Sequence, residues 1–259
     1  MDALVRTYLD RIGLAELPGD GLEALRAIQR RALAAIPFEN LDILRGIPLR
    51  FGTEELADKV LTRRRGGVCF ELNFLLEEVL RRLGMDTALL SGMVAGGSAG
   101  DFSHALVLVR LPQGRFIADV GFGRGYLTPL ALDRTDWQWD GRSRWRLRRE
   151  GTWDLLEEER ADGSIVQIYR FTDAPRRRED YRDMCDALCS SPQCKFTRML
   201  VCSRELPGGR LTLRDDFLRL ERPSLPPETT PVISGAQRDH LLAERFSLPP
   251  LGPDWRPRW

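Results

Sequence analysis

A cysteine lies near the start of an apolar segment, in a position that favours the thiolate form. Cys69 follows Gly66 and Gly67 and is the second residue of VCFELNFLLEEVLRRLG, whose apolar residues have helical spacing. At a helix N-terminus, unpaired backbone N–H groups and the positive end of the helix dipole stabilise a thiolate, the nucleophilic form of cysteine. The glycines allow a tight turn into the helix and leave space for a substrate. A buried cysteine more often packs as a small apolar side chain, so a catalytic interpretation of Cys69 requires partners.

His104 and Asp119 are the candidate partners of this thiol. His104 opens the strand-like run HALVLVRL, and Asp119 lies in RFIADVGF among apolar residues, where an unpaired carboxylate would be costly. Taken singly, each has an ordinary explanation, namely a histidine at a strand end and an aspartate that caps a turn. With Cys69 they form a set used in thiol catalysis, in which the carboxylate orients the imidazole and the imidazole holds the cysteine as a thiolate.

The register of one hairpin decides whether His104 and Asp119 meet. If LPQG, residues 111–114, closes the hairpin with an even-length loop, Leu106 faces Asp119. His104 and Asp119 then lie on the same face as diagonal neighbours, within reach of each other. An odd-length loop would place them on opposite faces of the sheet. The proposed triad therefore depends on this register.

Composition excludes several classes of function. Formal net charge is +1, from 39 basic and 38 acidic residues, which argues against a nucleic-acid partner. The N-terminus lacks the apolar region of a signal peptide, and no run of 18 apolar residues occurs, so we expect neither a leader nor a membrane span. The five cysteines are an odd number, which indicates reduced thiols and a cytoplasmic protein.

The first third of the chain is expected to be helical, and its helices must position Cys69. Apolar spacing predicts helices over residues 2–12, over 21–35 and over 53–62 with Thr53 as its cap. Pro37 ends the second helix because proline disfavours helical geometry in the residue before it. A fourth helix carries Cys69 at its front end and stops at Gly84.

The remaining chain is expected to be mainly β-strand, and it must position His104 and Asp119. Short apolar or alternating runs over 86–94, 104–111, 115–122, 145–159 and 164–171 predict an antiparallel barrel or curled sheet. A helix over 178–189, a hairpin over 196–220 and a last helix over 235–246 follow. The order of these elements predicts an α+β fold.

Four segments resemble the arylamine N-acetyltransferase family. RGGVCFELN (65–73) resembles the active-site cysteine motif, IPFENLDI (36–43) the N-terminal signature, and SHALVLV and FIADVGFG the histidine and aspartate segments, in family order. The resemblance implies an N-terminal helical bundle, a central antiparallel β-barrel and a C-terminal α/β lid around a cysteine-protease-like core. The expected domains are residues 1–84 with the cysteine, 85–177 with the histidine and aspartate, and 178–259 as the lid.

The resemblance also implies a reaction and its ligands. Acetyl-CoA would acylate Cys69, coenzyme A would leave, and a small aromatic amine or hydrazine would take the acetyl group, without a metal. Carried over by position, Phe122, Gly123 and Gly125 would lie near coenzyme A. Phe38 and Phe196 would line the acceptor pocket, although ordinary core packing explains them equally well.

Two other features carried over from the family concern the surroundings of the site. Glu39 and Arg65 could pair to brace it, or Arg65 could be a solvated charge. Where family members often carry histidines, this chain has Gln29 and Ala32, which bears on substrate preference. The oligomeric state does not follow from the sequence.

Alternative functions share parts of this pattern. An amide synthase of the same family would use the triad to release a carrier-bound acyl chain as a macrolactam. A papain-like or transglutaminase-like thiol hydrolase also uses Cys, His and Asp in this order. An inactive binding module is disfavoured by the complete triad.

Four further signals are weaker. Residues 96–100 match G-x-S-x-G around Ser98, but that motif requires a strand-to-helix turn. Gly121, Gly123 and Gly125 lack dinucleotide-binding spacing, and His240 is expected at the surface. The remaining cysteines do not have zinc-ligand spacing and have no neighbouring histidine; they are Cys185, Cys189, Cys194 and Cys202.

Overall fold

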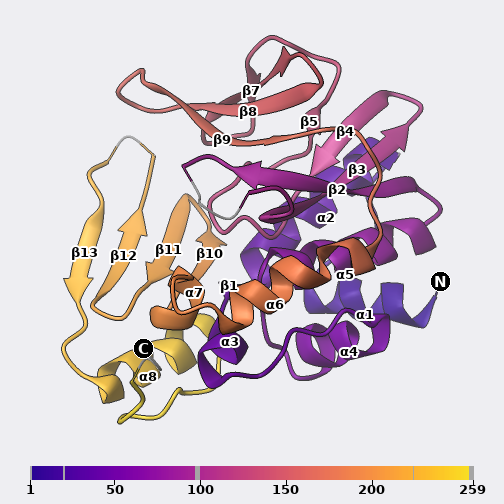
Figure 1. The fold of residues 1–259 in the computed structure, drawn as a ribbon. Helices are drawn as coiled ribbons and strands as arrows, with labels where there is room; N and C mark the ends of the chain where they lie inside the picture. Colours follow the sequence, from indigo (N-terminus) through magenta and orange to yellow (C-terminus); the bar gives the residue numbers. More distant parts are fainter. Residues whose placement is uncertain (1, 20, 97–99, 224, 257–259) are drawn as a thin grey trace.

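Two antiparallel sheets and a group of helices form the molecule (Figure 1). The structure is a computed structural model that describes residues 2–19, 21–96, 100–223 and 225–256. In chain order the helices are α1 (Ala3–Arg11), α2 (Gly21–Ala35), α3 (Leu41–Arg45), α4 (Thr53–Ala57), the π-helix η1 (Asp58–Thr62), α5 (Cys69–Arg82), the 3-10 helix η2 (Arg178–Tyr181), α6 (Arg182–Ser190), α7 (Lys195–Arg198) and α8 (Gly235–Phe246).

The larger sheet has eight strands and curls into a nearly closed barrel. Its spatial order is β5 (Leu130–Ala131), β4 (Gly114–Ala118), β3 (His104–Leu111), β2 (Asp86–Val94), β9 (Ile165–Phe171), β8 (Trp153–Glu159), β7 (Arg144–Glu150) and β6 (Gln138–Trp139). The Gln138 side chain links the two edge strands, because it accepts from the Ala131 N–H at 2.8 Å and donates to the Ala131 carbonyl at 3.0 Å. Aromatic and aliphatic side chains, among them Tyr126 and Trp145, fill the interior.

The smaller sheet combines an N-terminal segment with the C-terminal third of the chain. Its order is β1 (Phe38–Glu39), β10 (Cys202–Leu206), β11 (Gly209–Leu213), β12 (Phe217–Glu221) and β13 (Glu228–Pro231). Helix α8 packs against it around Leu242 and Phe246. Because the Glu39 N–H of β1 donates to the Gly67 carbonyl at 3.0 Å, this sheet is tied to the segment that leads into Cys69.

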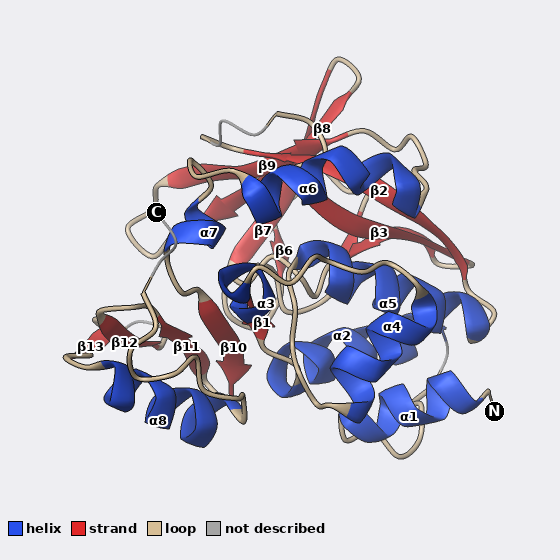
Figure 2. Cartoon of the chain, turned by 60° about the horizontal axis from the view of Figure 1, so that its bottom comes forward, coloured by secondary structure: helices blue, strands red, loops and turns tan. Residues whose placement is uncertain are grey.

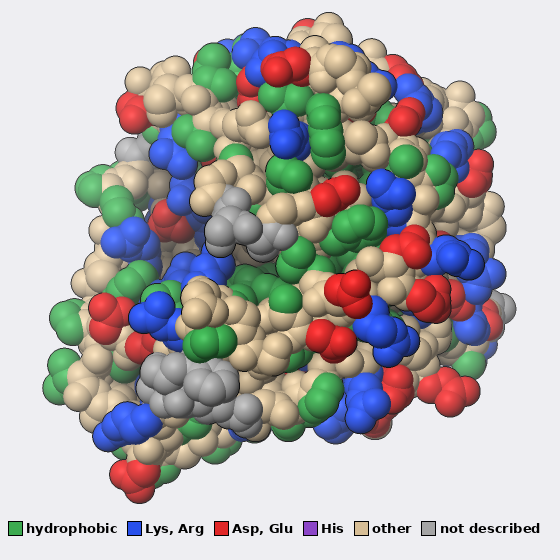
Figure 3. Space-filling view, viewed as in Figure 1, with side chains coloured by type: hydrophobic (Ala, Val, Ile, Leu, Met, Phe, Trp, Pro, Cys, Tyr) green, Lys and Arg blue, Asp and Glu red, His purple; other side chains and the backbone are tan. Residues whose placement is uncertain are grey.

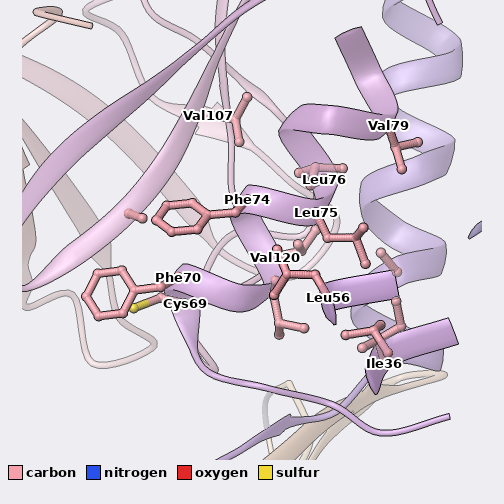
Figure 4. Close-up of a cluster of buried hydrophobic side chains, with 14 of the residues drawn as sticks. Ile36, Leu56, Cys69, Phe70, Phe74, Leu75, Leu76, Val79, Val107 and Val120 are labelled. Atoms are coloured by element: carbon pink, nitrogen blue, oxygen red, sulfur yellow. The ribbon is translucent and has the colours of Figure 1, made fainter. Parts of the chain in front are cut away.

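Helix α5 is the central element between the barrel and the other helices. It contacts β2 and β3 on one side and α1 and α4 on the other (Figure 2). Nearly all its residues up to Leu80 are buried, and not only those of the predicted apolar face. This burial is expected for a helix that is packed on all sides. Figure 4 shows the Cys69 sulfur and the rings of Phe70 and Phe74 on one side of α5, away from Leu56 and Ile36.

The predicted elements agree with the structure in most places and differ in three. The helices over 21–35 and 235–246 are confirmed to the residue. The predicted helix over 53–62 changes at Asp58 into η1, and its cap is Gly52, so the assignment of Thr53 as the cap was wrong. The predicted hairpin over 196–220 is instead α7 followed by three strands. The strand predicted over 115–122 ends at Ala118, before Asp119.

Candidate active site

Cys69 is the first residue of α5, as its position after the two glycines predicted. Val68 is the N-cap, and the Glu71 carboxylate accepts a hydrogen bond from the Val68 N–H at 3.1 Å, which satisfies one of the free donors at the helix start. Cys69 itself is 7% exposed. The thiol therefore lies at the positive end of a helix in mostly apolar surroundings.

His104 and Asp119 meet as the hairpin register predicted. Leu111 pairs with Gly114 and Val107 with Ala118, which is the even-length register. The His104 Nε2 lies 2.7 Å from the Asp119 Oδ2, and both residues are buried. The imidazole also hydrogen-bonds the Cys69 thiol, and since Nε2 is occupied by Asp119, Nδ1 is the ring nitrogen left for the sulfur.

These contacts set the charge of the imidazole. Burial by itself lowers the pKa of His104, but the Asp119 carboxylate and then Cys69 outweigh it and raise the pKa from 6.5 to about 10. His104 is therefore an imidazolium at neutral pH. This positive charge lies beside the Cys69 sulfur.

The Asp119 carboxylate is held by partners from four different parts of the chain. Its Oδ1 accepts from Asn73 Nδ2 at 2.9 Å and from the Gly121 N–H at 2.9 Å. Its Oδ2 accepts from the Tyr169 hydroxyl at 3.3 Å in addition to contacting His104. These donors compensate the burial of the carboxylate and fix its orientation.

Asn73 and Gln29 are positioning residues that the sequence interpretation missed. Asn73 lies one turn after Cys69 and bonds Asp119, the Val120 N–H at 2.9 Å and the Ala105 carbonyl at 2.6 Å. The Gln29 Oε1 accepts from the Asp119 N–H at 3.2 Å. The signal available for both was a polar residue within an apolar helical stripe. At Gln29, the departure from the family's histidine thus falls beside the triad carboxylate.

A buried network of charges braces the segment before Cys69. Arg65 contacts Glu39 and Asp42, each at 2.8 Å, so the predicted pair with Glu39 is confirmed and the solvated alternative for Arg65 was wrong. Lys59 contacts Asp42 at 2.8 Å and Glu71 at 2.7 Å. The network ends at the carboxylate that caps α5, so it ties β1, α3 and η1 to the start of the helix.

The glycines around Cys69 make room for the protein chain itself. A Cβ added at Gly66 would lie 1.9 Å from the Pro37 carbonyl oxygen, and one at Gly67 would lie 2.7 Å from the Glu71 carboxylate. The expectation that these glycines leave space for a substrate was wrong, because protein atoms fill that space. Gly121 also lies close to the site, since a Cβ there would lie 2.6 Å from the Cys69 Cα.

The residues expected near ligands lie around the triad. Phe122 packs edge-on against the His104 ring with centroids 5.1 Å apart, and Gly123, with φ of +75°, approaches the Phe38 ring. The rings of Phe38 and Phe196 are 5.9 Å apart. The Gly125 carbonyl, farther along the same loop, accepts a hydrogen bond from Arg142 at 2.6 Å. Ligand binding by these residues stays a prediction.

The weaker signals do not form sites in the part of the chain that is described. Ser98 lies outside the described residues, and residues 95–103 connect two strands, whereas the hydrolase motif needs a strand and a helix. All five cysteines are free thiols, and no group of three or more His, Cys, Asp or Glu side chains among the described residues could hold a metal. His240 is a surface residue, as predicted, with a side chain 72% exposed. None of the helices in the described ranges is long and apolar enough to cross a bilayer.

Comparison with known proteins identifies the family. A family model described as N-acetyltransferase matches residues 21–249. The arylamine N-acetyltransferase of Mycolicibacterium smegmatis is 35% identical over 250 residues, which cover 93% of this chain and 90% of the relative. Human arylamine N-acetyltransferase 1 is 34% identical over 232 residues, 79% of each chain.

Solved structures agree with the sequence comparison. The arylamine N-acetyltransferase from Salmonella typhimurium superimposes with a TM-score of 0.89 at 31% identity, covering 96% of this chain and 92% of that one. The Mycobacterium marinum enzyme in complex with CoA superimposes with a TM-score of 0.88 at 29% identity, covering 94% and 92%. The α+β fold of helices, barrel-like sheet and second sheet is therefore shared with these enzymes. The chain belongs to the arylamine N-acetyltransferase family.

Proposed function

We propose that this enzyme transfers an acetyl group from acetyl-CoA to a small aromatic amine or hydrazine through an acetyl-Cys69 intermediate. The observation that carries the proposal is the hydrogen-bonded series from Cys69 through His104 to Asp119 at the head of α5. A cysteine sulfur beside an imidazolium is the arrangement that a ping-pong acyl transfer requires.

The two half-reactions use the same groups. The Cys69 sulfur adds to the thioester carbon, the carbon–sulfur bond to coenzyme A breaks, and the departing thiolate takes the proton of the His104 imidazolium. In the second half-reaction neutral His104 accepts a proton from the amine as its nitrogen attacks the acetyl-Cys69 carbon. The sulfur leaves as a thiolate and the imidazolium is restored. Asp119 keeps the ring oriented in both directions.

The loop that follows Asp119 is the segment that we assign to the donor. Figure 3 shows Lys and Arg side chains gathered at a hollow on the face where the two sheets approach each other. Arg142 joins the loop at Gly125 to Glu205 on β10, so the loop after Asp119 is fixed against the smaller sheet. We propose that Phe122, Gly123 and Gly125 border the coenzyme A site.

Aromatic rings support an aromatic acceptor. Phe38 and Phe196 lie in tilted contact beside the loop that follows Asp119, and Phe122 covers His104. We propose that Phe38 and Phe196 contact the ring of the amine. Since all five cysteines are free thiols, the cytoplasm remains the compartment that we expect.

Intact-mass measurement after incubation with acetyl-CoA alone tests the mechanism. We expect one acetyl group, mapped to Cys69, and no adduct on Cys69→Ser. Cys185→Ser is the matched control, because burial raises the pKa of that thiol and it should contribute nothing. A folded parent protein that acetyl-CoA leaves unmodified but a longer carrier-bound thioester acylates would instead indicate the amide synthase. Loss of activity in Ser98→Ala but not in Cys69→Ser would contradict the mechanism.

A further inference from the structure

Tyr181 carries a buried hydroxyl that nothing in the described chain satisfies. It is the last residue of η2 and is fully buried, and its hydroxyl oxygen has no hydrogen-bond partner among the described residues. Burying a hydroxyl without a hydrogen-bond partner is unfavourable. Phenylalanine would fill the same volume without that cost, so the hydroxyl calls for an explanation.

Three phenyl rings fix the direction of this side chain. The Tyr181 ring lies 5.2 Å from the rings of both Phe74 and Phe102 and 5.6 Å from that of Phe70, in edge-on or tilted contact. A ring enclosed on three sides has little freedom to change rotamer in a close-packed core. The hydroxyl therefore stays where the fold places it.

Tyr181 packs beside the start of α5, where Cys69 lies. Phe70 follows Cys69 directly in α5, and Cys69 and Tyr181 belong to the same buried cluster. Burial, and after it the charge of Cys69, raises the pKa of Tyr181, while Arg176 acts in the opposite direction. The phenol is thus kept neutral, in the form that donates a hydrogen bond.

We propose that the Tyr181 hydroxyl donates a hydrogen bond to the carbonyl oxygen of the acyl group being transferred to and from Cys69. This inference rests on the proposed function, because it requires an acyl group on that sulfur. As the sulfur adds to the acyl carbon, an electron pair moves onto the carbonyl oxygen, and the phenol stabilises it without giving up its proton. The pair returns when the bond to the leaving thiolate breaks, so Tyr181 is a catalytic residue that ends the step unchanged.

Tyr181→Phe tests this assignment, and Tyr8→Phe is the matched control. Tyr8 also has a fully buried hydroxyl without a hydrogen-bond partner among the described residues, but the charged residue that acts on it is Arg11. Both variants should be at least as resistant to urea as the parent, because each loses an unpaired polar group. Tyr181→Phe should slow acylation of Cys69 at saturating donor by about tenfold or more, with KM little changed, and Tyr8→Phe should not.

The infrared carbonyl band of [1-13C]acetyl-Cys69 gives a direct readout. A hydrogen bond lowers this frequency, so Tyr181→Phe should move the band higher, and Tyr8→Phe should leave it in place. p-Nitrophenyl acetate is the second acyl donor, since it needs no coenzyme A site. If acetyl-CoA leaves Cys69 unmodified but the ester acylates it, the proposed function fails while the band still tests Tyr181. Equal rates and frequencies in Tyr181→Phe and the parent, or acylation by neither donor, would overturn the inference.

Discussion

At the scale of single residues, the Asp119 carboxylate determines the charge state of the site. The buried imidazole would titrate below its ordinary pKa of 6.5 if burial acted alone, and the carboxylate is the leading reason that the pKa of His104 is instead about 10. The imidazolium–carboxylate interaction therefore stabilises the fold fully below pH 6.5, and this stabilisation is lost as the pH rises through about 10.

Asp119→Asn should lower the pKa of His104 to below 6.5, because burial remains and the main opposing charge is gone. Imidazole NMR can follow this directly, since the chain has two histidines and His240, with a side chain 72% exposed, serves as an internal reference. At pH 7 the neutral imidazole would no longer stabilise the thiolate, so iodoacetamide should alkylate Cys69 at least about tenfold more slowly. An unchanged His104 titration in the folded variant would show that Asp119 does not set the charge.

At the scale of elements, the network around Lys59 connects η1 to the helix that carries Cys69. Lys59 is the cation shared by Asp42 and Glu71, and all three side chains are buried. The contact with Lys59 lowers the pKa of Glu71 but does not offset burial, so the pKa is raised overall. Removing the cation would leave two carboxylates with too little compensation.

Lys59→Met should reduce the free energy of unfolding by about 3–5 kcal/mol, the usual cost of leaving a buried charge unpaired. Lys59→Met combined with Glu71→Gln should recover much of this loss, because Asp42 keeps its contact with Arg65. Arg63→Met is the surface control, since its pair with Asp58 is more than half exposed and should be worth at most about 1 kcal/mol. Urea unfolding measures all three. Equal losses in Lys59→Met and Arg63→Met would contradict the role given to the network.

Elements with a local signal were predictable, and elements set by tertiary contacts were not. Helix α2 ends before Pro37, so its end followed from a neighbouring residue. The π-helix η1 did not follow, because it buries Lys59, Val60 and Leu61 in succession, against helical periodicity. Lys59 is buried in η1 because it contacts carboxylates that lie outside this helix in the sequence.

The same distinction holds within the site. His104 and Asp119 could be paired from sequence because one short hairpin relates them. Asn73 is 46 residues from Asp119 and Gln29 is 90 residues from it, so no local register relates them. Tyr181 reaches the start of α5 only through packing of η2 on that helix, which a sequence pattern does not describe.

At the scale of the whole molecule, the site is assembled from all three regions of the chain. The thiol comes from α5, the imidazole and carboxylate from the barrel, and β10 of the smaller sheet closes the other side through Ser203, whose hydroxyl donates to the Gly123 carbonyl at 3.1 Å. The division at residues 84 and 177 remains a prediction, and β1 from the first region completes the sheet of the last.

Arg142→Met should weaken use of acetyl-CoA without disturbing the triad, because Arg142 is the link between the Gly125 carbonyl and Glu205 of the smaller sheet. Without it the loop that we assign to the donor site loses its fixed position. The KM for acetyl-CoA should rise by about tenfold, as expected for one lost charged interaction, while p-nitrophenyl acetate should acylate Cys69 at the parental rate. Arg144→Met, which breaks a partly exposed pair with Glu159, is the control and should change neither value. Glu205→Gln should reproduce the effect, and the double variant should lose less than the sum of the two, since both changes break one contact.

Equal loss with both donors would mean that Arg142 supports the fold as a whole, and no loss with either would place the donor away from this loop.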